Sequence, residues 1–165
     1  MSKALAVRPA SSDDLEAIRR IYNEGIEDRI ATLDREPKSR EEIAQWWSAH
    51  DGRYAVLVAT ESDDVIGWAS LNPFSQRCAH ENIADLSVYV ARHYRGRGAG
   101  YVLLTALAQG AAKSGFHKIV LHALDSNEHG KRLYRKSGFR EVGVFKEHGS
   151  LDGRYVDVVA LERLL

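Results

Sequence analysis

The segment VYVARHYRGRGAGYVLL, residues 88–104, joins a run typical of a β-strand to a run typical of an α-helix. Between the two runs the chain alternates glycine with other residues and carries two arginines: Arg95, Gly96, Arg97, Gly98 and Gly100. Glycine leaves the backbone uncovered, so the N–H groups at the helix N-terminus are accessible to an anion, and arginine can add charge-assisted hydrogen bonds. The segment therefore predicts a turn that binds a pyrophosphate.

Other glycine-rich motifs fit this segment poorly. A dinucleotide-binding fingerprint would have its last glycine where Tyr101 stands and an acidic residue about twenty positions further on, near Lys118. An ATP-binding loop needs a lysine and a hydroxyl side chain where the helix starts, and this helix starts GYVLLTAL. A plain strand–turn–helix with permissive glycines is the alternative that needs no ligand.

The composition of the chain sets its broad class. A length of 165 residues suits one domain with its own core, and we expect that domain to span residues 1–165. A single cysteine, Cys78, suits a reducing compartment, and we see neither a signal peptide nor the ~18-residue apolar run of a membrane span. Basic and acidic residues number 23 each, which argues against a broad nucleic-acid or membrane footprint. We expect a cytoplasmic globular protein with no nucleic-acid or membrane partner.

Apolar periodicity, caps and turn signals divide the chain into alternating strands and helices. Strands are predicted at 4–10, 54–60, 64–74, 83–91, 117–124, 141–151 and 155–165, and helices at 11–27, 39–50, 100–116 and 126–139. Asp152-Gly153 is a strong hairpin signal between the last two strands. Helices between strands, followed by a terminal hairpin, imply an α/β (α+β) fold with a mixed sheet and helices on both faces.

A family resemblance makes this prediction more specific. The pattern Arg95-x-x-Gly98-x-Gly100 after SVYV resembles the cofactor signature of the GCN5-related N-acetyltransferases (GNAT). Over nearly the whole chain, IYNEGIEDRIAT, GWASLNPF, LSVYVA, SNEHGKRLYRKSGF and DGRYVDVVALERLL resemble the phosphinothricin and arsinothricin N-acetyltransferase branch. This resemblance implies the GNAT fold, in which a mostly antiparallel sheet has parallel fourth and fifth strands that splay apart. It also implies acetyl-CoA as co-substrate and a homodimer.

The resemblance assigns the cofactor-binding residues. It places the pyrophosphate on the glycine turn and the pantetheine arm between the splayed strands, hydrogen-bonded like an extra strand. The predicted cofactor residues are Val88, Tyr89, Val90, Arg95, Gly96, Arg97, Gly98, Ala99, Gly100 and Asn127. The family often has a small hydroxyl side chain three residues after the asparagine, where this chain has Gly130.

Two residues are candidates for proton transfer. Acetyl transfer to an amine needs an acceptor for the amine proton, and Asp85 stands just before the predicted pantetheine segment, where the family usually has glutamate. Its side chain is one methylene shorter, which favours a relay through water; the other interpretation is a strand-edge aspartate that pairs with a surface cation. Tyr134 matches the tyrosine that often protonates the leaving thiolate in this superfamily, and a ring that packs on the sheet is the alternative.

The predicted substrate is a small amino acid or a similar amine, and it need not carry a second acidic group. Arg77 aligns with an arginine that contacts the substrate's acidic group in this branch, Ser87 is assigned to the same site, and Ser75 replaces a second basic residue. We expect direct acetyl transfer to the α-amine of an amino acid or antimetabolite such as phosphinothricin, arsinothricin, or methionine sulfoximine or sulfone. A solvated loop arginine, a non-catalytic acetyl-CoA sensor and a peptide or protein N-terminal acetyltransferase are the alternatives. The seven histidines show no ligand-like pairing, so we expect no metal.

Overall fold

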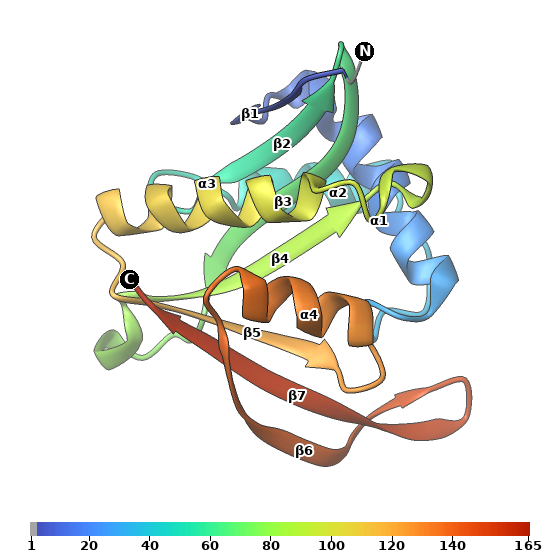
Figure 1. Cartoon of the computed structure of the whole chain (residues 1–165), viewed down its shortest axis with the longest axis vertical. Helices are drawn as coiled ribbons and strands as arrows, with labels where there is room; N and C mark the ends of the chain where they lie inside the picture. Colours follow the sequence, from blue (N-terminus) through green and yellow to red (C-terminus); the bar gives the residue numbers. More distant parts are fainter. Residues whose placement is uncertain (1–2) are drawn as a thin grey trace.

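The computed structural model describes residues 3–165, in which seven strands form a single sheet in the order β1-β2-β3-β4-β5-β7-β6 (Figure 1). The strands are β1 (Leu5–Pro9), β2 (Val56–Glu61), β3 (Asp64–Pro73), β4 (Ile83–Val90), β5 (Lys118–Leu124), β6 (Arg140–Leu151) and β7 (Arg154–Leu164). The helices are α1 (Leu15–Asp28), α2 (Arg40–Ser48), α3 (Ala99–Lys113) and α4 (Glu128–Lys136), with short 3₁₀ turns at Ser12–Asp14, Cys78–His80 and Arg92–Tyr94. Residues 1 and 2 of the predicted domain lie outside the described residues.

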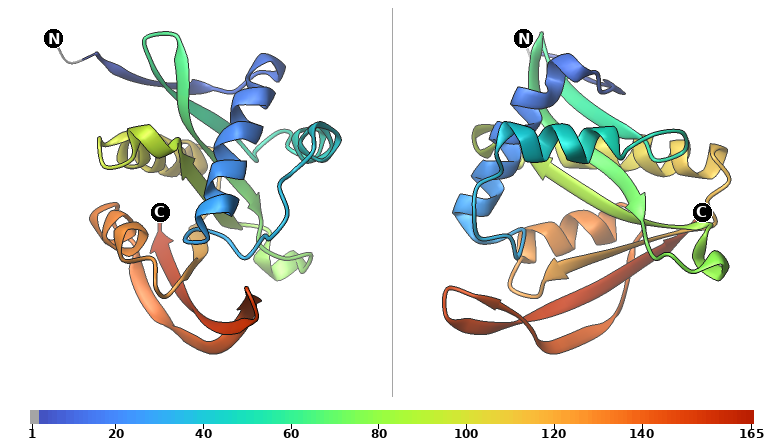
Figure 2. Two further views of the ribbon diagram at one scale, coloured as in Figure 1. Left: turned by 90° about the vertical axis from the view of Figure 1, so that its right-hand side faces the viewer. Right: turned by 180° about the vertical axis from the view of Figure 1, so that it is seen from behind.

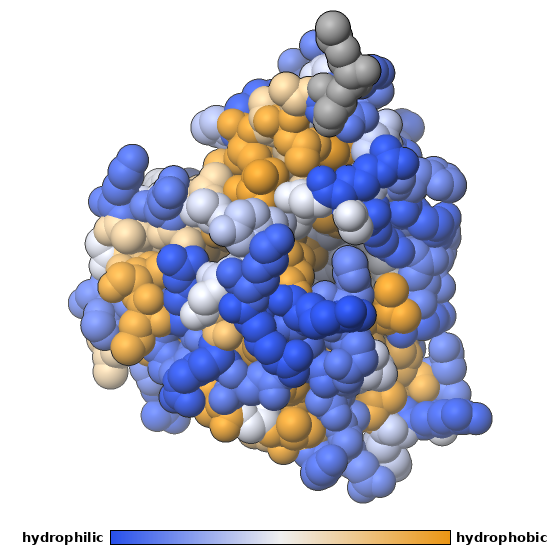
Figure 3. Space-filling view, in the orientation of Figure 1, coloured by the Kyte–Doolittle hydropathy of each residue, from blue (hydrophilic) through white to orange (hydrophobic). Residues whose placement is uncertain are grey.

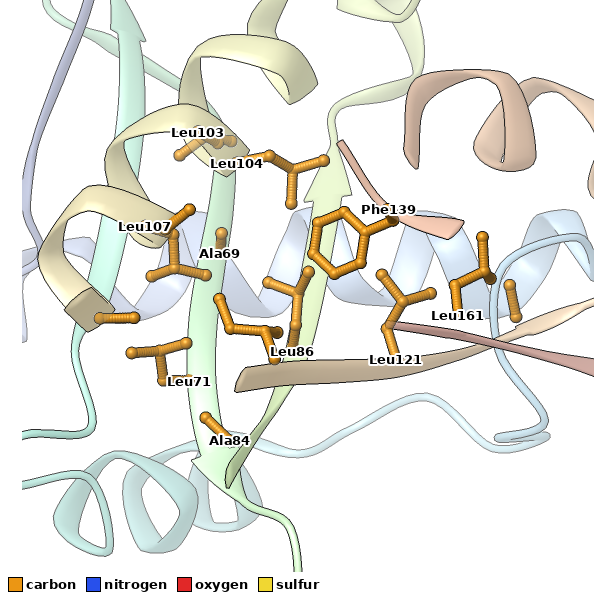
Figure 4. Close-up of a cluster of buried hydrophobic side chains, with 14 of the residues drawn as sticks. Ala69, Leu71, Ala84, Leu86, Leu103, Leu104, Leu107, Leu121, Phe139 and Leu161 are labelled. Carbon is orange, nitrogen blue, oxygen red and sulfur yellow. The ribbon is translucent and has the colours of Figure 1, made fainter. Parts of the chain in front are cut away.

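Helices cover both faces of the sheet, as predicted. In the left view of Figure 2, α3 and α4 lie on one side of the sheet and α1 and α2 on the other. The α3 face holds the larger core, in which Leu103, Leu104 and Leu107 pack against residues of the central strands (Figure 4). Burial of these side chains removes apolar surface from water and fixes α3 against the sheet. None of the described helices has the length and apolar character to cross a membrane.

The parallel pair β4–β5 separates partway along its length, which confirms the predicted splay. Pairing runs only from Ile83 opposite Lys118 to Asp85 opposite Val120. Figure 1 shows the two strands diverging beyond this point. On the β5 side, the backbone of residues 86–90 is therefore left without a strand partner, so it can hydrogen-bond an extended ligand.

Local signals define most element ends. Ser39 and Glu42 form the predicted capping box at the start of α2, and Gly115 ends α3 with φ +84°. The first predicted helix begins later than expected, because a 3₁₀ turn over residues 12–14 precedes α1. In this turn the Asp14 carboxylate accepts a hydrogen bond from the Ser11 backbone N–H at 2.8 Å and pairs with Arg8.

Candidate active site

A cavity of about 380 Å³ lies between the separated end of β4, the N-terminal end of α3 and the length of α4. It is lined by nine of the ten predicted cofactor residues: Val88, Tyr89, Val90, Arg95, Gly96, Gly98, Ala99, Gly100 and Asn127. The tenth, Arg97, is not among the lining residues. Its guanidinium carbon lies 5.3 Å from the centre of the Tyr94 ring, and Tyr94 itself lines the cavity. The role of Arg97 stays a prediction.

The glycine turn has the backbone geometry of an anion site. Gly96 and Gly98 have φ values of +76° and +94°, in the left-handed region that other residues rarely adopt. Gly98 is the N-cap of α3, so the first N–H groups of this helix lack intrahelical acceptors and carry partial positive charge. A Cβ on Gly100 would lie 2.7 Å from Leu133 Cδ2, so this glycine lets α3 approach α4 closely. These features fit a bound pyrophosphate.

Arg95 is held inside the protein by two contacts. Its Nη1 lies 2.6 Å from the Asp28 carboxylate at the end of α1, and its Nε donates to the Val90 carbonyl oxygen at 3.1 Å. Hydrogen bonds from Arg92 and then Arg95 hold the pKa of Asp28 below its usual value. Arg95 therefore fixes the turn to α1 and β4, and its charge is already paired. Whether it also binds the pyrophosphate stays a prediction.

Helix α4 supplies cations that the sequence analysis missed. Arg132 and Lys136 line the same cavity, and Lys136 Nζ lies 4.8 Å from the centre of the Tyr101 ring. Hydrophilic side chains gather over α4 on the face shown in Figure 3. Asn127 caps this helix, because its Oδ1 accepts a hydrogen bond from the Gly130 N–H at 2.9 Å. A Cβ on Gly130 would lie 2.5 Å from Asn127 Nδ2, so the missing hydroxyl side chain makes room for the cap.

A second cavity of about 270 Å³ adjoins the first at the point where β4 and β5 separate. Both predicted proton-transfer residues, Asp85 and Tyr134, line it together with Ser87 and His122. Tyr134 also lines the first cavity, so it stands at the junction of the two. Burial raises the pKa of Tyr134 to about 12, which keeps its hydroxyl protonated at neutral pH.

The environment of Asp85 suits a proton acceptor. Burial raises the pKa of its carboxyl group, while the hydrogen bond from Asn72 Nδ2, at 3.4 Å, and the nearby His122 oppose this rise. A raised pKa makes a carboxylate a stronger base. Asp85 pairs with no surface cation among the described ion pairs, and the polar partner it does have, Asn72, was not singled out from the sequence.

A larger cavity of about 540 Å³ lies between the sheet and helices α1 and α2. Its walls include the aromatic rings of Tyr22, Trp46, Trp68 and Tyr89, and it also touches Ser87. Ser87 and Tyr89 line both this cavity and the one that holds Asp85. The predicted substrate residue Ser87 therefore stands between the cavity that holds Asp85 and a larger one lined by both aromatic and charged side chains.

Arg77 lies further from these cavities than its predicted role suggests. It is exposed, it precedes the 3₁₀ turn between β3 and β4, and it lines none of the three cavities. Its backbone N–H donates to Ser75 Oγ at 3.1 Å, and that hydroxyl also lies 2.7 Å from His80 Nδ1. Its substrate contact stays a prediction. Among residues 3–165, no three His, Cys, Asp or Glu side chains are grouped to hold a metal ion.

Comparison with known proteins is consistent with this geometry. The sequence pattern of the acetyltransferase (GNAT) family matches residues 15–139. A phosphinothricin N-acetyltransferase of Streptomyces coelicolor is 36% identical in an alignment of 163 positions, which covers 96% of this chain and 95% of that protein. The crystal structure of a GNAT superfamily phosphinothricin acetyltransferase from Sinorhizobium meliloti in complex with acetyl-CoA superposes with a TM-score of 0.93 at 30% identity, covering 100% of this chain and 89% of that one. A ribosomal-protein-alanine N-acetyltransferase from Brucella melitensis gives 0.94 at 32% identity, covering 97% and 99%.

Proposed function

Because this chain belongs to the acetyltransferase (GNAT) family and is an acetyl-CoA-dependent N-acetyltransferase, we propose that its substrate is the α-amine of a small amino acid or amino-acid-like antimetabolite. One observation carries this proposal: Asp85 and Tyr134 line one small cavity that adjoins the cofactor groove where β4 and β5 separate. The residues proposed as base and acid thus lie beside the cavity lined by the predicted cofactor residues, which supports the proposal.

The residues of this junction suit direct transfer. Acetyl-CoA supplies an acetyl group as a thioester, and an amine can attack it only after losing a proton. We propose that Asp85 receives this proton, directly or through one water molecule, and that Tyr134 donates a proton to the departing thiolate sulfur. The raised pKa of Asp85 favours the first step, and the protonated state of Tyr134 favours the second.

The dimensions of the site favour a small substrate over a peptide. The cavity that holds Asp85 has a volume of about 270 Å³, which lies at the small end of ligand pockets. Such a volume suits a free amino acid or a compound of similar size, such as phosphinothricin. The similarity to a ribosomal-protein-alanine N-acetyltransferase keeps peptide N-termini as the second candidate.

We also propose that the working form is a homodimer. Strand β6 is the last strand of the sheet, and its Val142 and Phe145 are 53% and 46% exposed. An open edge strand with exposed apolar side chains favours pairing with another chain. Light scattering after size exclusion should give the parent protein twice the monomer mass of 18.4 kDa. The double variant Val142→Glu, Phe145→Glu should have the mass of one monomer. A monomeric parent would reject this proposal.

A substrate panel tests the proposed activity. The purified protein is incubated with acetyl-CoA and, in separate reactions, phosphinothricin, methionine sulfoximine, methionine sulfone, free amino acids and a short peptide with an N-terminal alanine. Thiol release is measured and the products are identified by mass spectrometry. We expect N-acetylation of at least one free amino acid or analogue at a kcat/KM well above that for the peptide. A clear preference for the peptide would overturn the proposed substrate class while leaving the acetyltransferase chemistry in place.

A further inference from the structure

A chain of hydrogen bonds leads from Asp85 away from the catalytic cavity and ends at His50, just after α2. Asn72 lies opposite Asp85 in the β3–β4 register, and its side-chain amide is the central link. On one side, the amide Nδ2 donates to Asp85 Oδ2 at 3.4 Å and to Ser87 Oγ at 3.1 Å. On the other side, the amide Oδ1 accepts from Ser70 Oγ at 3.0 Å and lies 2.8 Å from His50 Nε2.

The Nδ1 atom of His50, which faces away from Asn72, can act only as a hydrogen-bond donor. His50 Nδ1 lies 2.7 Å from the backbone carbonyl oxygen of Trp46, and a carbonyl oxygen can only accept. Nδ1 must therefore carry a hydrogen. If Nε2 faces the amide oxygen of Asn72, it must carry a hydrogen too, and the ring is then a cationic imidazolium. In this arrangement the amide nitrogen of Asn72 faces Asp85, which accepts as an ionised carboxylate.

Rotation of the Asn72 amide by half a turn gives a second self-consistent arrangement. The nitrogen then faces His50 Nε2, which accepts as part of a neutral ring, and the oxygen faces Asp85, which must donate as a protonated acid. The hydroxyl groups of Ser70 and Ser87 can either donate or accept, so they tolerate both orientations. The protonation states of His50 and Asp85 alone decide between them.

States in which only one of the two residues, His50 or Asp85, is charged are unfavourable. A neutral His50 with an ionised Asp85 leaves two acceptors facing each other at one end of the amide. A cationic His50 with a protonated Asp85 keeps its hydrogen bonds, because the carbonyl oxygen of the acid still accepts, but it leaves a net positive charge on the pair. The two other states, one with both residues charged and one with both neutral, have neither of these faults. Both have zero net charge over the pair, which suits a half-buried site.

We propose that His50 and Asp85 change protonation together through the amide of Asn72, which makes His50 a positioning residue for proton transfer. This inference rests on the proposed role of Asp85 as base. When Asp85 takes the proton of the substrate ammonium group, the Asn72 amide rotates and His50 releases its Nε2 proton to solvent. One proton enters the pair and one leaves it, so the site stays neutral; after the product departs, Asp85 loses its proton and His50 regains one.

Other titratable groups around the pair are few. His122 from β5 and Tyr134 from α4 line the same cavity as Asp85, and Asp51 follows His50 in the chain. Among the hydrogen bonds of the described residues, the two ring nitrogens of His50 contact only Trp46 and Asn72. A titration of the His50 ring therefore reports mainly on the state of this chain of hydrogen bonds.

Nuclear magnetic resonance of the ring nitrogens tests the coupling. The full-length protein is labelled with ¹⁵N-histidine, His50 is identified by the signal lost in His50→Gln, and its titration is followed in the parent and in Asp85→Asn. We expect the neutral ring to carry its proton on Nδ1, and the midpoint to move to lower pH by about one unit in Asp85→Asn, because the stabilising anion is gone. A midpoint that is the same in both proteins would overturn the coupling.

Kinetics give a second, independent readout. In His50→Gln, the acid-side midpoint of amine kcat/KM should move to higher pH by about one unit, since the cation that favours ionised Asp85 is lost. His117→Gln changes an exposed histidine just before β5; it is the matched control and should leave the profile unchanged. An unmoved midpoint in His50→Gln would count against the proposal, and if this variant fails to fold, the titration in Asp85→Asn still decides.

The two proposals can fail separately. If Asp85→Asn keeps full turnover but shifts the His50 midpoint, the coupling stands and Asp85 is not the base. If Asp85→Asn loses turnover without moving the His50 midpoint, the base role stands and the coupling is rejected.

Discussion

Asp85 lies directly opposite Val120 in the last residue pair that joins β4 to β5. The strands separate immediately afterwards, so Asp85 lines the cavity that begins at this point, where we expect the pantetheine arm to end. The thioester is at the end of that arm, and for this reason we propose Asp85 as the base.

Replacement of Asp85 by asparagine removes the proposed proton acceptor. We expect turnover to fall, with a deficit that shrinks from about pH 6 to about pH 9 as free amine becomes more abundant, while acetyl-CoA affinity changes little. Profiles of kcat/KM against pH measure this, with Asp63→Asn, an exposed carboxyl on the β2–β3 turn, as control. An unchanged profile would move the role of base to another group.

The same variant has a predicted effect on stability. Because burial raises the pKa of Asp85 in the folded protein, the folded state holds this proton more tightly than the unfolded state does. The stability that this group contributes is present below its unfolded pKa and is lost as pH rises through the folded pKa. Asp85→Asn should therefore have a higher Tm than the parent near pH 7, and the difference should vanish in acid.

Tyr134→Phe tests the proposed acid. We expect kcat to fall by about 10²-fold with little change in acetyl-CoA affinity, because only the hydroxyl at the cavity junction is lost. With a pKa of about 12, Tyr134 should add no falling limb to the pH profile of the parent below about pH 10. Tyr155→Phe, a strongly exposed tyrosine on the terminal hairpin, serves as control. Parent-like kcat in Tyr134→Phe would assign its ring to packing alone.

The glycine turn can be tested with the smallest possible side chain. Gly98→Ala puts a Cβ on a residue with φ +94°, which should cost about 1–2 kcal/mol of stability and weaken acetyl-CoA binding in calorimetry. Gly110→Ala lies in the same helix, where a Cβ would meet no atom within 4 Å, and should raise stability slightly. Equal acetyl-CoA affinities in Gly98→Ala and the parent would place the pyrophosphate elsewhere.

Arg132 and Lys136 of α4 line the cavity that holds the predicted cofactor residues, opposite the end of β4, and can be tested in the same way. Arg132→Ala and Lys136→Ala should each raise the acetyl-CoA KM several-fold, which corresponds to a loss of about 1 kcal/mol of binding free energy. Each variant should also reduce the dependence of this KM on salt concentration. Arg135→Ala is the matched control, because Arg135 lies on the same helix but pairs with Glu141 outside the cavity lining. If all three variants behave alike, Arg132 and Lys136 do not contact the phosphates.

The sequence could predict the elements and the glycine turn because both depend on local rules. The hairpin at Asp152-Gly153 has φ values of 50° and 76°, and the glycine turn likewise depends only on residues that are neighbours in the chain. The alternation in WASLN and DLSVY also places Ser70 and Asn72, and likewise Asp85 and Ser87, on one face of each strand. The register between these strands depends on pairing across residues 74–82, and periodicity does not determine it.

Contacts between distant segments were beyond the reach of sequence patterns. His50 meets Asn72 because α2 packs against the sheet through Trp46 and Trp68, whose ring centres lie 5.2 Å apart. Arg95 meets Asp28 because α1 ends beside the glycine turn. No local sequence pattern indicates either contact, because tertiary packing alone brings these side chains together.

Arg77→Ala tests the predicted substrate contact. A substrate with an α-carboxylate needs a fixed cation, and the planar guanidinium group binds carboxylates in a bidentate manner. The exposed position of Arg77 in the β3–β4 connection leaves its side chain available for such a partner. We expect the amine KM to rise at least about tenfold, which corresponds to a loss of about 1.4 kcal/mol of binding free energy, with little change in the acetyl-CoA KM. Arg154→Ala, an exposed arginine at the start of β7, is the control. Equal amine KM values in Arg77→Ala and the parent would assign Arg77 to the solvated surface.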